Sequence, residues 1–394
     1  MEPGFCHSIA PMVDLAGILR PGDGIVWGQA CAEPQTLVEA LVAQRAAFSG
    51  AHAFLGVSHS GLVKPEHADH LRLASYCGTG ANRALADAGV LELDPVPYSQ
   101  LGGLFERKSI PCDVVLLQVS PPNGRGEYSL GLAVEYLAPA LKAARAIVAE
   151  VNHRVPWTHT EPLLHRKDFA RIVETSRDPV YMSYRTGETE LAVARHAAAF
   201  VPERAVLECG LGQLPNAVLG ALTERRGLRV HSGAIPDGVA ELHRCGALTG
   251  EIHGGALMGT QALFDWAREN PQLRLHSSAY THGAAQLARL ERFVAINSAV
   301  EIDFTGQVNA EVARGSYVGA VGGALDFIRA ANQSPGGVSL VVLQASRIVE
   351  KLSGPVATPR SEAGVVVTEK GAADLRGCTL RERERRLRAL SGSS

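Results

Sequence analysis

The 394-residue sequence has few aromatic residues, no excess of either charge and no long apolar run. Aromatic residues make up 5% of the chain, and no apolar run reaches the roughly 18 residues that a membrane-spanning helix needs. The 38 Lys and Arg residues are balanced by 40 Asp and Glu residues. This balance argues against a nucleic-acid binder, which would carry a clear basic excess.

Cysteines and histidines also lack the spacings of well-known metal and disulfide sites. The seven cysteines include no CxxC pair, so neither a disulfide framework nor a thiolate metal site is indicated. His59, His67 and His70 fit no HxxxH or HExxH pattern, and we expect them to be solvated rather than bound to metal. Residues 1–12 lack the basic-then-apolar layout of a signal peptide. We therefore expect a cytoplasmic protein with reduced, packed thiols and no metal.

Short β-branched runs alternate along the chain with stretches rich in alanine and leucine. Such continuous apolar runs are typical of strands that are covered on both faces, as in parallel sheets. The runs expected to form strands are Gly24–Trp27, Asp113–Val119, Ala146–Val151, Ala205–Leu207, Val338–Leu343 and Gly364–Val367. The stretches expected to form helices are Pro34–Phe48, Leu130–Arg145, Glu188–Phe200, Pro215–Arg225, Thr260–Glu269 and Ala324–Ala331. The alternation predicts an α/β protein.

A single segment is a candidate domain boundary. Residues 176–188 carry Pro, Gly and charges without a helical or strand period. We expect two similar open-sheet α/β domains, residues 1–180 and residues 186–394. Each half contains a strand, a glycine turn and a helix with a proline after the glycines, at residues 28–34 and 210–215.

The glycine turn of the second half indicates a phosphate-bearing ligand. It reads Gly-Leu-Gly-Gln-Leu-Pro at residues 210–215 and follows an expected strand. Because glycine has no side chain, a ligand can approach its backbone closely, and the free N–H groups at the start of a helix attract phosphate. A dinucleotide fingerprint would need glycine where Pro215 stands and an acidic residue about twenty residues on, where the next strand reads Leu-Arg-Val-His. A Rossmann dehydrogenase and, because GxxxxGK[ST] does not occur, a P-loop NTPase are both excluded.

Many spaced motifs, in order over nearly the whole chain, give this sequence a resemblance to a known family. They include GQACAEPQ (28–35), VSPPNGRGEYSLGLAV (119–134), GLGQLPNAVLGAL (210–222), FVAINSAVEIDFTGQ (293–307), GAVGGALDFIRA (319–330) and VVTEKGAADLRG (366–377). In these motifs the chain resembles the acetyl-CoA hydrolase/transferase family (family I CoA-transferases), within it the 4-hydroxybutyrate CoA-transferase-like branch.

The resemblance implies two α/β domains with the active site between them. It also implies exchange of coenzyme A between an acyl-CoA and a small free carboxylate, with CoA as substrate and no tightly bound cofactor. In such enzymes a glutamate attacks the thioester, forms an anhydride and then carries CoA as a glutamyl thioester. A homodimer is the usual assembly of such relatives.

The position that the resemblance assigns to this glutamate holds Gly233 instead. The rest of the family motif is present, with His231 and Ser232 before this position and Asp237 and Gly238 after it. A glycine has no side chain, so it can form neither the anhydride nor the enzyme thioester. This departure predicts atypical catalysis or none.

The resemblance also implies the remaining site residues. Residues expected to bind CoA are Gly210, Leu211, Gly212, Gln213, Leu214, Val300, Gly319 and Gly323. Gly322 and Gly323 match backbone donors to an oxyanion, and His282 stands where relatives carry a positioning asparagine. Glu301 is a candidate general base, although structural support of the site is the favoured interpretation of this residue. A pair of adjacent His231 and Ser232 as base and nucleophile is disfavoured, because neighbours on a strand point to opposite faces.

Three hypotheses about function follow. The favoured one is a CoA-transferase or acyl-CoA hydrolase that acts on a small acyl-CoA through another residue or an activated water. The second is a CoA-binding paralogue without covalent catalysis, acting as a regulatory or partner subunit. The third is an acyl-CoA enzyme of altered chemistry, with His282 or Glu301 as its acid–base group.

Overall fold

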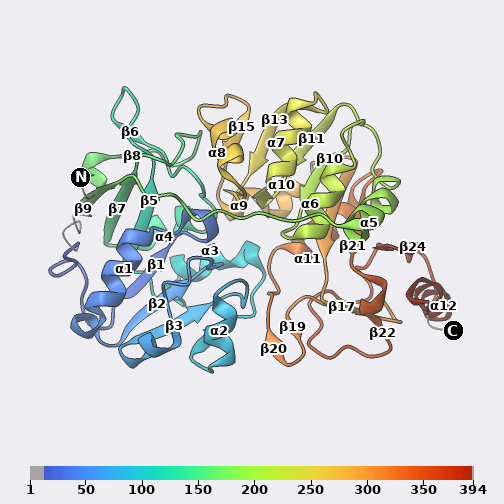
Figure 1. The fold of residues 1–394 in the computed structure, drawn as a ribbon, viewed down its shortest axis with the longest axis horizontal. Coiled ribbons are helices and arrows are strands. Elements are labelled where there is room, and N and C mark those ends of the chain that lie inside the picture. Colours follow the sequence, from blue (N-terminus) through green and yellow to red (C-terminus); the bar gives the residue numbers. More distant parts are fainter. Residues whose placement is uncertain (1–12, 393–394) are drawn as a thin grey trace, which may run out of the picture.

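The computed structural model describes residues 13–392, and its elements form two large sheets that follow one another in sequence (Figure 1). Residues 1–12, which carry Cys6 and the segment compared with signal peptides, lie outside the described residues. Every strand of the first sheet precedes residue 176, and every strand of the second follows residue 205. The predicted α/β class is confirmed.

The first sheet has seven parallel strands in the order β4-β3-β2-β1-β5-β7-β9. Its central strands are buried on both faces, as the continuous apolar runs predicted. The strands are β1 (Gly24–Trp27), β2 (Ala51–Leu55), β3 (Leu71–Ser75), β4 (Leu91–Leu93), β5 (Val114–Val119), β7 (Ala146–Asn152) and β9 (Arg171–Thr175). The helices of this half are α1 (Gln35–Gln44), α2 (Asn82–Asp87), α3 (Tyr98–Glu106) and α4 (Leu137–Ala143).

The second sheet has eight strands in the order β15-β13-β11-β10-β16-β21-β23-β24. All neighbours are parallel except the hairpin of the last two. The strands are β10 (Val206–Cys209), β11 (Leu228–His231), β13 (Leu248–Gly254), β15 (Leu273–Leu275), β16 (Phe293–Ser298), β21 (Val338–Val342), β23 (Val365–Thr368) and β24 (Gly371–Asp374). The helices are α5 (Glu188–Ala198), α6 (Gln213–Gly220), α7 (Asp237–Arg244), α8 (Gln261–Ala267), α9 (Ser278–Thr281), α10 (Ala284–Leu287), α11 (Ala324–Gln333) and α12 (Leu380–Ser391).

Small strand pairs and one long connection complete the fold. The small strands are β6 (Glu127–Tyr128), β8 (Leu164–His165), β12 (Ala234–Ile235), β14 (Ala256–Leu257), β17 (Glu301–Asp303), β18 (Val308–Asn309), β19 (Val312–Ala313), β20 (Ser316–Tyr317) and β22 (Ile348–Val349). Residues 176–187 form no helix or strand and run from β9 across the face of the molecule to α5 (Figure 1). Among residues 13–392, no helix is both long and apolar enough to cross a membrane.

One predicted helix is wrong over half its length. Of the stretch Leu130–Arg145, the helix covers Leu137–Ala143 alone. Residues 130–136 are instead buried non-helical backbone, because they lie against the second half of the chain. The Val134 N–H donates to the Gly255 carbonyl, and the Leu257 N–H donates to the Leu132 carbonyl. The apolar side chains that suggested a helix face serve this contact.

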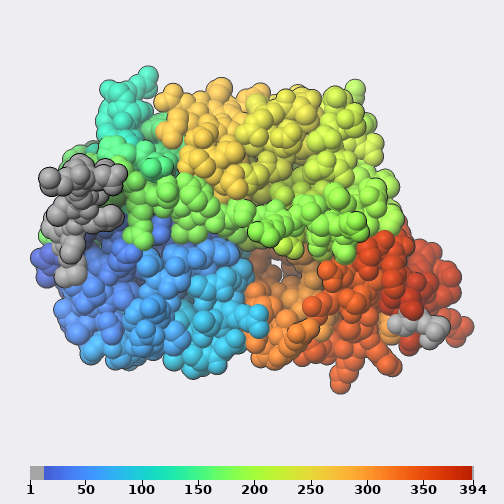
Figure 2. Space-filling view, viewed as in Figure 1, coloured from blue at the N-terminus to red at the C-terminus, as the bar shows by residue number. Residues whose placement is uncertain are grey.

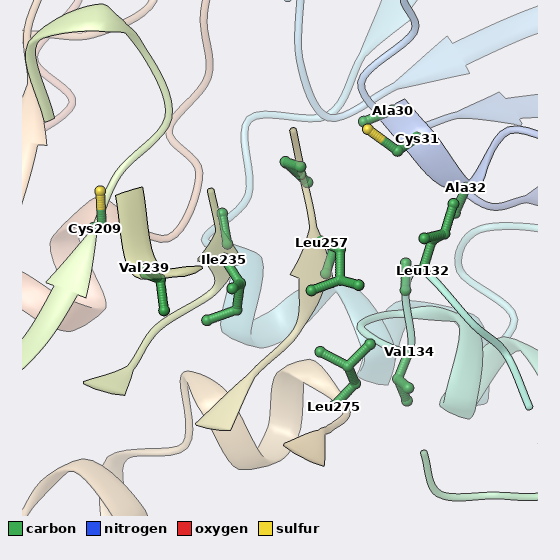
Figure 3. Packing of buried hydrophobic residues seen from close by; sticks show 14 of the residues in the cluster. Ala30, Cys31, Ala32, Leu132, Val134, Cys209, Ile235, Val239, Leu257 and Leu275 are labelled. Atoms are coloured by element: carbon green, nitrogen blue, oxygen red, sulfur yellow. The ribbon is translucent and has the colours of Figure 1, made fainter. Parts of the chain in front are cut away.

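The contact between the halves is apolar at its centre (Figure 3). Leu132 and Val134 from the first half pack in one cluster with Ile235, Leu257 and Leu275 from the second. All five side chains are at most 1% exposed. At roughly 1.5–3 kcal/mol for each buried side chain of this size, the contact holds the two halves together.

Candidate active site

A cavity of about 360 Å³ lies where the two halves meet. The first half contributes Tyr76–Cys77 and Tyr98 to its lining, and the second contributes Gly210–Leu211 and Val318–Ala324. The two walls are joined by backbone hydrogen bonds, such as the one from the Tyr98 N–H to the Gly322 carbonyl (3.0 Å). Figure 2 shows a small hollow where the cyan and orange segments of the two halves adjoin.

The glycine turn after β10 meets this cavity with its first two residues. Gly210 and Leu211 line the cavity, whereas Gly212, Gln213 and Leu214 do not. Gly212 is the N-cap of α6 with φ at +124°, a backbone that favours glycine. Pro215 is the third residue of the helix, where its missing N–H leaves no bond unmade.

The other residues expected to bind CoA all reach the cavity. Val300, Gly319 and Gly323 line the cavity. The Gly319 N–H is already bound to the Glu311 carbonyl, so Gly319 contributes a wall rather than a donor. Gly323 is the N-cap of α11, a ten-residue helix whose first N–H groups have no partner within the helix. This helix start can therefore offer donors to an oxyanion in the cavity.

His282 occupies the space beside the two glycines at 233 and 323. A β-carbon on residue 233 would lie 3.0 Å from His282 Cε1, and one on Gly323 would lie 2.3 Å from His282 Nε2. The ring also contacts Phe327 and Tyr98, with centroid separations of 4.4 and 5.0 Å. His282 Nδ1 lies 2.9 Å from Thr281 Oγ1. Gly233, His282 and Gly323 thus lie next to one another in the structure.

The electrostatics of His282 follow from its burial. Burial, with His231 nearby, lowers the pKa of His282 to about 3. The imidazole is therefore neutral at physiological pH. In that state it can accept or donate a hydrogen bond, but it is a weak base.

Two buried glutamates also line the cavity, and neither lies in a motif that marks it as a site residue in the sequence. Glu208, on β10, accepts hydrogen bonds from Asn297 Nδ2 (2.7 Å) and the Ile296 N–H (3.2 Å). Burial nevertheless raises the pKa of Glu208 to about 8. Glu135 accepts from Gln29 Nε2 (2.7 Å), and burial raises the pKa of Glu135 to about 7. Perturbed carboxyl groups in a cleft are a mark of functional sites.

Glu301, the carboxylate predicted as a general base, lies outside the residues that line this cavity. Its carboxylate accepts from the Ser353 N–H (2.9 Å) and Ser353 Oγ (2.8 Å). Partial burial alone would raise the pKa of Glu301, but these bonds and one from Asn309 outweigh burial and hold the pKa below its ordinary value. The geometry matches the favoured interpretation of Glu301, structural support.

Nearby thiol and hydroxyl groups are not activated as nucleophiles. Burial raises the pKa of Cys31 to about 12 and that of Cys209 well above its ordinary value, so both are thiols at neutral pH. Ser232 Oγ donates to the Cys209 carbonyl, while His231 Nε2 lies 2.9 Å from the Thr281 carbonyl oxygen. His231 and Ser232 therefore do not pair. Among residues 13–392, no group of three or more His, Cys, Asp or Glu side chains could hold a metal ion.

Two α/β halves with a glycine-lined cavity where they meet agree with what the resemblance to CoA-transferases implies, and comparison with known families supports it. The acetyl-CoA hydrolase/transferase N-terminal domain matches residues 5–181, and the C-terminal domain of the same family matches residues 259–393. The chain belongs to the acetyl-CoA hydrolase/transferase family.

Individual relatives support the same assignment. The chain is 33% identical over 383 residues to 4-hydroxybutyrate coenzyme A transferase of Clostridium kluyveri, covering 92% of this chain and 89% of the relative. Its structure is similar to that of RipA from Yersinia pestis (TM-score 0.90, 27% identity, 95% of this chain and 91% of the other). It is also similar to 4-hydroxybutyrate CoA-transferase from Porphyromonas gingivalis (TM-score 0.79, 28% identity, 94% and 90% of the two chains).

Proposed function

We propose that the protein cleaves the thioester of a small acyl-CoA in the cavity between its two halves. In hydrolysis water takes the acyl group and CoA leaves as the free thiol, whereas in transfer CoA passes to a small carboxylate. The observation that carries this proposal is the cavity itself, in which Gly210–Leu211, the start of α11 and buried carboxyl groups converge. A thioester carbonyl there would find backbone donors on one side and a carboxyl group on the other.

The size of the cavity supports a small acyl group. A volume of about 360 Å³ is at the lower end of ligand sites and suits a short acyl chain with the end of the pantetheine arm. Two relatives are named as CoA-transferases for 4-hydroxybutyrate, whose acyl chain is short enough for a cavity of this size.

Gly233 favours water over a covalent enzyme intermediate. We propose that residue 233 is the nucleophile position implied by the family resemblance and that this chain has no carboxylate there. Hydrolysis needs one activated water, whereas ping-pong transfer needs a carboxylate that can form an anhydride. Hydrolysis is therefore the first reaction to test.

The test follows two products from acetyl-, propionyl-, butyryl- and 4-hydroxybutyryl-CoA. Free CoA thiol formed without acetate reports hydrolysis, and acetyl-CoA formed from the last three substrates with acetate reports transfer. We expect release from at least one of them without acetate, with turnover well above the rate in buffer. Binding of CoA, followed by calorimetry, serves as the parallel measurement. Binding without turnover of any substrate in either condition would support the non-catalytic paralogue instead.

A cytoplasmic homodimer stays a prediction within this proposal. Light scattering on the purified chain measures the assembly directly, with twice the 41.7 kDa chain mass expected.

A further inference from the structure

Glu135 lies at the junction of the two halves, in a backbone conformation that glutamate rarely adopts. Its φ is +34°, in the left-handed region, although it is not a glycine. Two hydrogen bonds from the second half hold it there: its N–H donates to the His276 carbonyl (3.2 Å), and its carbonyl accepts from the Ser278 N–H (3.1 Å). Strain of this kind persists where the surroundings impose it, and it is concentrated at functional sites.

The carboxyl group of Glu135 is oriented by a fixed set of donors. Gln29 Oε1 accepts from Tyr76 Oη (2.8 Å) and the Val57 N–H (2.9 Å), so the amide nitrogen of Gln29 must point the other way. That nitrogen donates to Glu135 Oε2 (2.7 Å) and to Tyr98 Oη (3.0 Å). The Tyr98 hydroxyl is in turn hydrogen-bonded to Glu135. Three side chains, those of Gln29, Tyr76 and Tyr98, thus hold one buried carboxyl group in a single orientation at the cavity wall.

Glu135 is also a close neighbour of the position that lacks a side chain. The Gly255 N–H donates to the Gly233 carbonyl (2.9 Å), and a β-carbon on Gly255 would lie 3.1 Å from Glu135 Cγ. A single glycine therefore separates Glu135 from the backbone of Gly233. Both residues line the same cavity.

We propose that Glu135 is the catalytic carboxylate of this site and acts as the general base that activates water against the thioester of a bound acyl-CoA. The inference rests on the proposed function and names the residue that performs it. Glu135 takes a proton from water as the water oxygen bonds to the thioester carbonyl carbon. The tetrahedral intermediate then breaks its C–S bond, and the electron pair leaves with sulfur. Glu135 returns the proton to the thiolate, which gives CoA thiol and a free carboxylic acid.

The titratable groups around Glu135 suit this cycle. Tyr76, Tyr98 and Tyr136 surround it, and burial raises the pKa of each tyrosine well above its ordinary value, so all three are neutral. His282 and Glu208 line the same cavity, and His282 is neutral as well. A general base works best when its pKa lies near the working pH, as that of Glu135 does.

The experiment compares wild type with Glu135→Gln, Glu135→Gly and Glu135→Asp on the substrate with the fastest release of CoA. Glu135→Gln keeps the hydrogen-bonding shape, and we expect its kcat to fall about 100-fold or more with KM and CoA binding unchanged. Glu135→Gly removes the carboxyl group and also the left-handed strain, so it should fold at least as well as wild type and be equally inactive. Glu135→Asp should recover part of the rate, with a shifted midpoint in the pH profile of kcat/KM.

Glu150→Gln is the matched control. Glu150, on β7, is also a buried carboxyl group, held by Thr36 Oγ1 (2.9 Å), but it does not line the cavity. Its substitution should leave kcat/KM within about twofold of wild type. Folded, CoA-binding Glu135→Gln and Glu135→Gly proteins that retain wild-type kcat would overturn the role of Glu135 while leaving the proposed function standing. A wild type that binds CoA and cleaves no acyl-CoA would overturn both.

Discussion

The imidazole of His282 lies against the α-carbon of Gly233, in the space where a side chain at residue 233 would begin. A β-carbon there would lie 3.0 Å from Cε1 and 3.2 Å from Nε2 of His282. Gly233 does not have a positive φ, so its backbone is open to other residues. The obstacle to a side chain at residue 233 is therefore the ring of His282. A larger residue at position 233 requires a smaller one at position 282.

This relationship predicts the outcome of restoring a carboxylate. Gly233→Glu alone should show little acetate-dependent CoA transfer, because the new side chain meets the His282 ring. Gly233→Glu combined with His282→Asn should show clear transfer from butyryl-CoA to acetate, since the smaller amide gives the carboxylate room beside the start of α11. His282→Asn alone is the control and should give no transfer. Equal transfer by the single Gly233→Glu variant and the double variant would show that His282 does not block the site.

Binding of CoA should depend on the glycine turn after β10. Wild type should be stabilised by CoA, by about 2.7 kcal/mol at 100 times Kd. In Gly210→Ala the added methyl would lie 2.6 Å from Asn297 Oδ1, so the cavity wall must shift and the stabilisation by CoA should fall. Gly220→Ala is the control, since nothing lies within 4 Å of a β-carbon there. It should bind CoA like wild type and gain roughly 0.5–1 kcal/mol of stability. A Gly210→Ala protein with the wild-type melting shift would place CoA elsewhere.

Glu208 should make stability depend on pH. Its pKa rises from an ordinary 4.5 to about 8 on folding, so the native state keeps a proton that the unfolded chain has lost between these values. The contribution of Glu208 to the free energy of unfolding is therefore present below pH 4.5 and is lost as the pH rises toward 8. Glu208→Gln removes this effect. Measured by urea unfolding at pH 5 and pH 8, the variant should gain stability relative to wild type at the higher pH. The same difference in unfolding free energy between variant and wild type at pH 5 and pH 8 would contradict the raised pKa of Glu208.

The sheets could be predicted from the sequence because their signal is local. The runs Gly24–Trp27 and Val338–Leu343 are continuous and β-branched, and the strands observed there match to within one residue. The positions of Gly210 and Gly323 at the cavity could also be predicted, because their motifs are contiguous in sequence. Both line the cavity.

Glu135 could not be found in this way, because its role depends on contacts between the halves. It lies in the stretch Leu130–Arg145, whose apolar residues resemble a helix face, and a glutamate there is expected to be solvated. Its left-handed φ and its burial are imposed by His276 and Ser278, about 140 residues away in sequence. The sequence offers Glu301 as a candidate base instead because it lies in a recognisable motif, yet Ser353 binds its carboxylate outside the cavity. The Gly131 φ of +66° shows the same departure from a helix.

The most direct test is a single turnover of acyl-CoA in water enriched in oxygen-18, followed by mass spectrometry of both the acid product and the intact protein. Activation of water by Glu135 predicts one heavy oxygen in the released acid, no CoA adduct on the protein and no label in the peptide that carries Glu135. A CoA adduct on any glutamate, Glu301 included, or label in a glutamate side chain would contradict the account and identify a covalent carboxylate.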